Sequence, residues 1–270
     1  MLFYVFLAVS AIFSIVLSVC CFSGAALLWM IPIFIGTFIV IVLIYCGFVA
    51  LVSVFIDTEK KPEKYDSFFT KVTISALDFF VTLAGGKIHV NGREKMPTVP
   101  YLMVLNHRSL MDPVSGLIAF KKDKLTFVSK QENQNIPVIG KYLHAIGTLT
   151  LDREDARKAL KTINEAADMI KDGKASIAIC PEGTRNRTEN NLLEFHHGSF
   201  KIAQKAKCPL VVACYRNTDQ LKKHPVFKRT DIYIDILGVK MPDELDSLRT
   251  SDMSDWAWNL IDEHLRSVKA

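Results

Sequence analysis

The chain has 270 residues, of which 33 are Lys or Arg and 28 are Asp or Glu, so its formal net charge is +5. All 61 charged residues lie within residues 57–270, where they make up about 28% of the sequence, an ordinary proportion for a water-soluble domain. This uneven distribution excludes a disordered chain, a collagen-like fibre and a simple cytosolic enzyme, and it indicates a membrane segment joined to a globular body.

The uncharged N-terminal segment, residues 1–56, is long enough for two membrane crossings. As one helix it would extend about 80 Å at ~1.5 Å per residue, whereas the hydrocarbon core of a bilayer is ~30 Å thick. We therefore predict two apolar helices over residues 2–22 and 26–55, with a break at Ser23-Gly24. A cleaved secretory signal peptide is the alternative, but such peptides begin with basic residues and none precedes Lys60.

Basic residues follow the apolar segment directly, at Lys60, Lys61 and Lys64. The positive-inside rule predicts that this flank and the globular body behind it lie on the cytoplasmic side of the membrane. With two crossings, the N-terminus would lie on the cytoplasmic side as well.

Residues 57–86 contain an amphipathic helix, which ends at Gly85-Gly86. Between residues 65 and 83, apolar side chains recur at spacings of three or four, and charged residues lie between them. The five aromatic residues on the apolar side are Tyr65, Phe68, Phe69, Phe79 and Phe80. The helix could pack on the core of the body or lie in the lipid interface, and its position directly after the anchor favours the interface.

Residues 87–270 alternate between short apolar runs and helical periods, which predicts a single α/β domain with a central mixed sheet flanked by helices. The expected strands are residues 87–91, 101–105, 125–129, 175–180, 210–215 and 231–237.

Two helices of this domain have clear boundaries in the sequence. Residues 153–171 form the clearer one, with Asp152 as its N-terminal cap and Gly173 as its terminator. Its expected buried stripe is Ala156, Leu160, Ile163, Ala167 and Ile170. The last helix is expected over residues 252–268, with Ser251 as its cap.

The sequence contains no framework for a metal or a cofactor. None of its six cysteines forms a Cys-x-x-Cys pair, so we expect free thiols in a reducing compartment. It also lacks a His-Glu-x-x-His motif, a Gly-x-Ser-x-Gly elbow, a P-loop and a dinucleotide fingerprint. In a membrane-tethered chain, the positive net charge fits anionic lipid headgroups better than nucleic acid.

The first stretch with recognisable chemistry follows the apolar run at residues 101–105. Asn106 and His107 come at the carboxyl end of that expected strand, where open α/β sheets place ligands. Asp112 lies five residues past His107, close enough in the chain to fold back onto one imidazole nitrogen. Such a contact would fix the tautomer and leave the other nitrogen free to accept a proton.

The second stretch is residues 177–185, where another apolar strand runs into a polar turn. Gly183 permits a tight backbone and the close approach of a ligand. Arg185 offers a planar fork suited to a phosphate group, although a surface ion pair is the alternative role for a single Arg.

Together these stretches resemble the glycerolphosphate acyltransferase superfamily, and most closely its 1-acylglycerol-3-phosphate (lysophosphatidate) acyltransferase branch. The first block resembles a His-x4-Asp motif at His107 and Asp112, and the third is Pro181-Glu182-Gly183-Thr184-Arg185. The residues at the spacings of the second block are Lys130, Pro137, Gly140, Gly147, Asp152 and Arg153. The resemblance covers roughly residues 65–215.

The segment after the third block both matches and departs from the family. Phe195 and Gly198 resemble its Phe-x-x-Gly segment, but His196 and His197 stand where Lys is frequent. Val211-Val212 replaces the Val-Pro pair that is usual in the fourth block.

The resemblance implies a reaction and roles for these residues. An acyl group would move from acyl-CoA or acyl carrier protein to the free hydroxyl of 1-acylglycerol-3-phosphate, giving phosphatidate without a metal or cofactor. His107 would act as general base and Asp112 would orient it. The acceptor would be bound by residues of the first three blocks, with Arg185 on its phosphate and Lys130 and Arg153 as helpers. Glu182, Gly183 and Thr184 would form the turn that carries Arg185. Asn106 would order the His107 loop.

Other functions remain open at this point. The acceptor could instead be glycerol-3-phosphate or another lysophospholipid, the same residues could activate water in a hydrolase, and a non-catalytic lipid-binding protein could keep the fold. The bilayer is an expected partner and nucleic acid is not. We expect a cell inner membrane, or the endoplasmic reticulum membrane if the source is eukaryotic.

Overall fold

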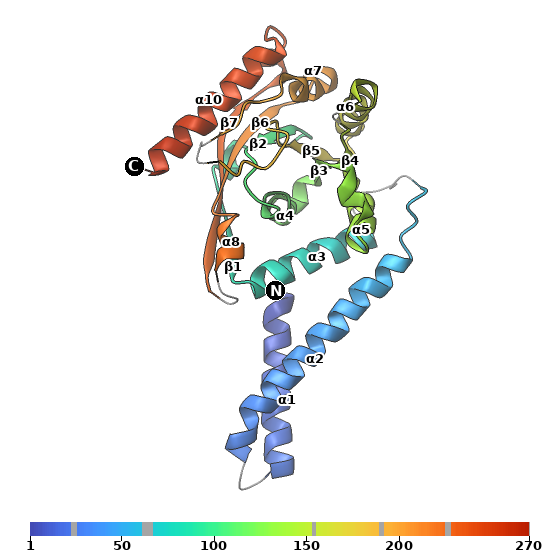
Figure 1. Cartoon of the computed structure of the whole chain (residues 1–270), viewed down its shortest axis with the longest axis vertical. Coiled ribbons are helices and arrows are strands. Elements are labelled where there is room, and N and C mark those ends of the chain that lie inside the picture. The colour runs from blue at the N-terminus through green and yellow to red at the C-terminus, as the bar shows by residue number, and fades with distance from the viewer. Residues whose placement is uncertain (23–25, 61–66, 153–154, 189–191, 225–227, 270) are drawn as a thin grey trace.

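The computed structural model describes residues 1–22, 26–60, 67–152, 155–188, 192–224 and 228–269. Two long apolar helices extend from one end of an α/β body, and a third helix lies where the two parts meet (Figure 1).

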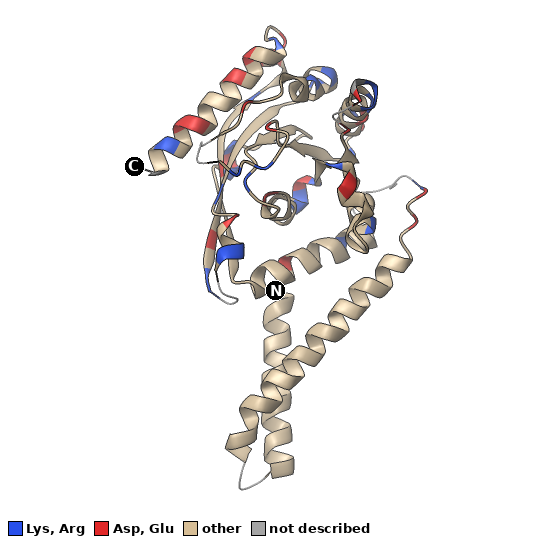
Figure 2. Ribbon diagram, in the orientation of Figure 1, with Lys and Arg blue, Asp and Glu red and all other residues tan. Residues whose placement is uncertain are grey.

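The two long helices are α1 (Leu2–Phe22) and α2 (Ala26–Val54), and they confirm the predicted pair to within one residue at each end. The predicted break at Ser23-Gly24 lies outside the described residues. By length and composition, both helices could cross a membrane, and neither carries a charged side chain (Figure 2). The buried residues of α1 include Ser10, Ser14 and Ser18 at a spacing of four, and Ser14 Oγ donates to Met30 O of α2 at 2.5 Å.

Helix α3 (Phe68–Leu83) lies between the helix pair and the body, and it begins after Ser67, whose hydroxyl accepts a hydrogen bond from Thr70 N. Phe79 is 1% exposed and contacts rings on both long helices. Phe68 and Phe80 are 60% and 41% exposed. One side of α3 therefore packs inside the protein, as one interpretation of its sequence expected, while two of its aromatic rings remain on the outside.

The body contains a seven-stranded mixed sheet with the order β1-β7-β6-β2-β5-β3-β4. Neighbouring strands are parallel except for β6 and β7, which are antiparallel. The strands are β1 (Gly86–Asn91), β2 (Leu102–Leu105), β3 (Leu125–Ser129), β4 (Leu149–Thr150), β5 (Ser176–Ile179), β6 (Leu210–Arg216) and β7 (Thr230–Lys240). The mixed α/β sheet and six of these strands confirm the prediction. Strand β4 was not predicted, because two residues are too few to produce an alternating pattern.

The remaining helices connect the strands or close the domain. They are α4 (Met111–Ala119), α5 (Ile139–Ala145), α6 (Ala156–Lys171), α7 (Lys201–Ala206), α8 (Gln220–Lys223), α9 (Pro242–Leu245) and α10 (Thr250–Lys269). Short 3-10 turns are η2 (Arg93–Lys95), η3 (Lys121–Asp123), η4 (Gln131–Asn135) and η5 (His197–Phe200).

Two apolar cores lie on opposite faces of the sheet. Leu102 and Val104 of β2 belong to the core that α6, α7 and α10 cover. Met103 and Leu105 belong to the core on the side of α3 and α4. Central strands buried on both faces have nearly continuous apolar sequences, which is why they were recognisable without alternation.

The structure corrects the predicted start of two helices. Asp155, not Asp152, caps α6, because its side chain accepts hydrogen bonds from Arg157 N and Lys158 N. Asp152 instead accepts from Asp155 N and pairs with Lys158. Helix α10 begins at Thr250, so Ser251 is its second residue and not its cap.

The expected buried stripe of α6 was only partly right. Ala167 and Ile170 are buried, but Leu160 is 45% exposed. Ala159 and Ile163, in the same half of the helix, line an open cavity that is described below. Apolar periodicity identifies the face of a helix, and it cannot distinguish a packed core from the wall of a cavity.

Candidate active site

Asn106 sets the point where the chain leaves the central sheet. Its side chain, 1% exposed, donates from Nδ2 to Tyr215 O at 2.9 Å and accepts from Tyr215 N at 2.7 Å through Oδ1. The amide therefore continues the pairing of β2 with β6 by one position beyond the last strand residue. These hydrogen bonds fix the position of the backbone where His107, the next residue, begins the loop.

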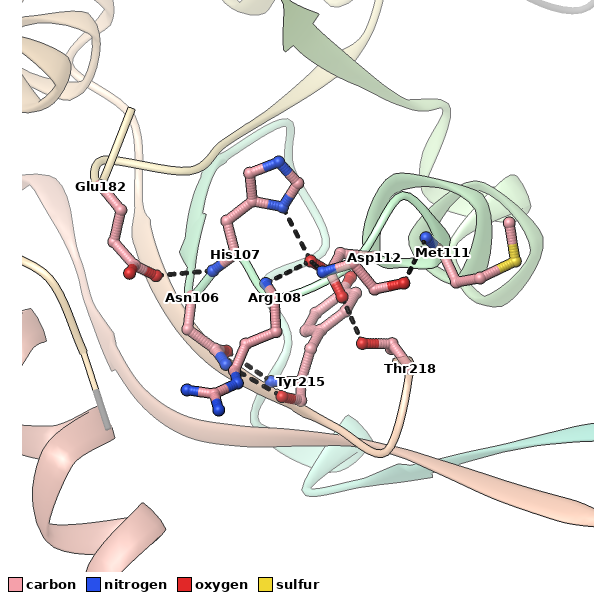
Figure 3. Close-up of polar contacts among 9 residues, drawn as sticks. Asn106, His107, Arg108, Met111, Asp112, Glu182, Tyr215 and Thr218 are labelled. Carbon is pink, nitrogen blue, oxygen red and sulfur yellow. Dashed lines mark hydrogen bonds and ion pairs between the residues drawn. The ribbon is translucent and has the colours of Figure 1, made fainter. Parts of the chain in front are cut away.

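Asp112 lies in the first turn of α4 and is fully buried. Its Oδ2 accepts hydrogen bonds at 2.8 Å from His107 Nδ1, Arg108 N and Ser109 N, and its Oδ1 accepts from the hydroxyl of Thr218 (Figure 3). The backbone N–H groups can only donate, so this oxygen is an acceptor and Nδ1 carries the imidazole proton. In the neutral form of the ring, Nε2 carries a free lone pair, and this atom points away from Asp112 (Figure 3).

The loop after β5 holds the backbone of His107 from the other side. Glu182 accepts from His107 N at 2.6 Å with Oε1 and from Leu193 N at 3.0 Å with Oε2. Asn186 N donates to His107 O at 2.7 Å. The two loops that the sequence singled out are thus joined by two hydrogen bonds, both to the backbone of His107.

Glu182 is 4% exposed, and this burial raises the pKa of its carboxyl group, although the His107 and Leu193 N–H donors act in the opposite direction. The folded protein therefore binds a proton more readily than the unfolded chain at and above the ordinary Glu pKa, so its stability falls as pH rises through that window. The substitution Glu182→Gln removes this titration.

We expect Glu182→Gln to melt below the wild type, because an amide offers only one acceptor to two N–H groups. The deficit should shrink as pH rises from the ordinary Glu pKa upward, as measured by melting temperature in detergent over a pH series. The exposed Glu132→Gln serves as the control for loss of a carboxyl group. A Glu182→Gln deficit that stays constant with pH would contradict the proposed cause.

Gly183 makes the turn that leads to Arg185. Its φ is +74°, a left-handed conformation that other residues rarely adopt, and its N–H donates to Cys180 O at 3.0 Å. The sequence-based expectation of a tight turn at this glycine is confirmed. Thr184 is exposed and Arg185 half-buried beyond the turn.

A cavity of about 630 Å³ opens beside His107. Its basic lining side chains are Lys130, Arg185 and Arg187, and its apolar lining includes Leu110, Phe127, Val128, Leu151 and Ile163. Such a cavity can hold an anionic group at one part of its wall and a hydrocarbon chain at another. Arg185 and Lys130 thus lie on the same cavity as His107, whereas the predicted helper Arg153 lies outside the described residues.

Three residues of this arrangement were not found from the sequence. Thr218 contacts Asp112 from 106 positions away, and no local pattern marks it. Arg187 lines the cavity, and its position only two residues past Arg185 was the available signal. Asn186 begins an Asn-x-Thr sequence, but its side chain is 3% exposed and accepts from Thr188 N and Oγ1, so it is part of the loop's internal structure.

Comparison with known proteins gives matches that centre on this part of the chain. A family model described as Acyltransferase matches residues 87–216. The 1-acyl-sn-glycerol-3-phosphate acyltransferase of Saccharomyces cerevisiae is 30% identical over 190 residues, which cover 69% of this chain and 61% of the relative. A probable 1-acyl-sn-glycerol-3-phosphate acyltransferase of Mycoplasma pneumoniae is 31% identical over 159 residues, covering 57% and 58%. The chain thus spans about three fifths of the length of these two relatives.

A solved structure has a similar fold. The crystal structure of the 1-acyl-sn-glycerophosphate (LPA) acyltransferase PlsC from Thermotoga maritima superimposes with a TM-score of 0.59, covering 84% of this chain and 89% of that chain. Its sequence identity is 23%, so this likeness concerns the fold alone.

Proposed function

We propose, from the match of residues 87–216 to the Acyltransferase family model, that the chain transfers a fatty acyl group from an acyl thioester to the free hydroxyl of 1-acylglycerol-3-phosphate. The product is phosphatidate. The observation that carries the proposal is the His107 imidazole, held by Asp112 through Nδ1, beside a cavity that also has Arg185 and Lys130 on its wall.

His107 acts as the general base in this mechanism. Its Nε2 takes the proton of the acceptor hydroxyl while the oxygen attacks the thioester carbonyl carbon. The C–O bond of the new ester forms, the C–S bond breaks, and the proton passes from the imidazolium to the departing thiolate. Attack is direct, so no acyl-enzyme forms, and Asp112 stabilises the imidazolium while it exists.

Arg185 binds the phosphate of the acceptor through charge-assisted hydrogen bonds, with Lys130 and Arg153 as helpers. The apolar side chains on the cavity wall, among them Phe127 and Ile163, receive a hydrocarbon chain. Glu182 and Gly183 act indirectly, because they shape the loop that carries Arg185 and support the backbone of His107. The reaction needs no metal or cofactor, and either acyl-CoA or acyl carrier protein can deliver the thioester.

The helix pair anchors the enzyme in a membrane, with the body on the cytoplasmic side of a cell inner membrane or of the endoplasmic reticulum. The outward Phe68 and Phe80 of α3 then lie at the lipid interface. This placement spares the acceptor's acyl chain a passage through water, which would cost ~0.8 kcal/mol per methylene group.

The test is an assay of the purified full chain with a labelled acyl thioester and a panel of acceptors. We expect labelled phosphatidate from lysophosphatidate, and slower product formation from glycerol-3-phosphate and lysophosphatidylglycerol. Turnover of lysophosphatidylglycerol but not of lysophosphatidate would refute the proposed acceptor. Release of free fatty acid without transfer would instead identify a hydrolase.

Thr218 acts as a positioning residue for Asp112. The isosteric Thr218→Val removes the hydroxyl that donates to buried Asp112 Oδ1, and hydrogen bonds to charged groups contribute about 1.5–3 kcal/mol. We expect kcat to fall about tenfold with an unchanged KM for lysophosphatidate, as measured by initial rates. Thr218→Ser should restore most of the rate, and an equal loss in both variants would show that the hydroxyl is not responsible.

A further inference from the structure

We propose that a second cavity, at the junction of α1, α3 and the turn η3, binds an anionic phospholipid of the surrounding bilayer. The cavity has a volume of about 590 Å³ and shares no described lining residue with the cavity beside His107. Lipid binding there does not require acyl transfer, so this proposal and the proposed function can fail independently.

The rim of the cavity is strongly basic. Lys121, Lys122 and Lys124 line it from η3 and the following residue, and all three are exposed. None of the three pairs with a carboxylate within the described parts of the chain. Lys71 of α3 adds another ammonium group to the lining. The carboxylate on the lining is Asp78, which pairs with the N-terminal ammonium of Met1 at 3.4 Å.

The conformation of this basic turn is already fixed by the protein. Arg93 donates to Asp123 Oδ2 at 2.8 Å and to Ala119 O at 3.0 Å, and its guanidinium lies 5.0 Å from the centre of the Phe120 ring. Asp123, the acid within the turn, is therefore neutralised by Arg93. The lysines on either side of it are left to attract an anion, and their backbone needs no further ordering.

The other part of the cavity is apolar and continues along a membrane helix. Leu2 and Val5 of α1 line it together with Ile74 of α3. From Val5 onward, exposed apolar side chains recur on α1 at spacings of three or four, at Val5, Val9, Ile12, Val16 and Val19. This stripe extends for about 21 Å at ~1.5 Å per residue, more than the ~15 Å that one leaflet contributes to the hydrocarbon core.

Charge and apolar surface are thus arranged as a phospholipid requires. An anionic headgroup fits among the lysines at the level where the body meets the helix pair, and its acyl chains follow the stripe on α1 into the leaflet. A free phosphate would use only the rim, and a zwitterionic lipid would gain little from the lysines.

Photolabelling of the full chain tests this assignment. The protein is placed in phosphatidylcholine vesicles that contain a minor fraction of photoactivatable phosphatidylglycerol, and chymotryptic peptides are analysed, since replacing Lys by Gln does not alter those cleavage sites. We expect label in the first turns of α1 and in residues 121–124. The variant Lys121→Gln/Lys122→Gln/Lys124→Gln should lower labelling of these peptides by about tenfold or more.

The matched control is Lys201→Gln/Lys205→Gln/Lys207→Gln on and after α7, which belongs to the opposite face of the sheet. It removes the same charge from exposed positions and also includes one left-handed lysine, since φ is 48° at Lys207 and 52° at Lys124. In this control variant, the peptides from α1 and residues 121–124 should be labelled to the same extent as in the wild type. An equal loss of labelling in both triple variants, or no loss in either, would overturn the proposal.

Two further experiments distinguish the binding of a lipid from the binding of a simple anion. Val5→Trp fills the apolar part of the cavity and leaves every lysine in place. It adds a chymotryptic site in α1, so labelling is compared on the peptide that contains residues 121–124, where it should be abolished. Undiminished labelling of that peptide would overturn the proposed path of the chains. Soluble glycerol-3-phosphate should not compete with the photolipid. Effective competition, or equal labelling by photoactivatable phosphatidylcholine, would overturn the assignment of an anionic phospholipid.

Discussion

Replacement of His107 by Ala should lower kcat for acyl transfer by about 10²–10⁴-fold, which is the usual contribution of a positioned general base. The KM for lysophosphatidate should change little, because the side chains that we propose for phosphate binding are left in place. Single-turnover and steady-state rates with a labelled acyl donor measure both quantities.

The chain contains a suitable control for this substitution. His89 also forms a short contact with a carboxylate, from Nε2 to Asp231 Oδ1 at 2.6 Å, but it does not line the cavity beside His107. His89→Ala removes a comparable His–Asp pair and should retain the wild-type kcat. If His107→Ala were as active as His89→Ala, with a normal melting temperature, the proposed mechanism would be wrong.

Replacement of Arg185 by Gln should raise the KM for lysophosphatidate about 10–100-fold, since hydrogen bonds to charged groups contribute about 1.5–3 kcal/mol. The KM for the acyl donor should stay within a few-fold of its wild-type value. The KM of Arg185→Lys for lysophosphatidate should lie between those of the wild type and Arg185→Gln, because an ammonium group keeps the charge but lacks the planar fork of the guanidinium.

Arg249→Gln is the matched control for Arg185. Arg249 is an exposed residue paired with Asp252, outside the cavity, and its replacement should leave both KM values unchanged. A larger effect of Arg185→Gln on the donor than on the acceptor would reassign Arg185 to the thioester substrate. Variation of each substrate at a fixed concentration of the other distinguishes these results.

Much of the fold could be predicted because its signals are local. The long apolar helices, the central strands and α10 each bury enough apolar surface to leave a run or a period in the sequence. The helix starts were less certain, since Asp152 and Asp155 are both good caps and only hydrogen bonds to the first turn distinguish them. The two-residue β4 and the exposed Leu160 show where periodicity ceases to be informative.

The pairing of His107 with Asp112 was determined by the sequence itself, because five residues span the end of a strand and the first turn of a helix. The left-handed turn at Gly183 is local in the same sense. Only the tertiary structure brought Glu182 and Thr218 to this pair, from 75 and 106 positions away. The physical reason is that β2 lies between β5 and β6 in the sheet, so the loops that follow these strands meet at one edge, and strand order is decided by packing across the whole domain.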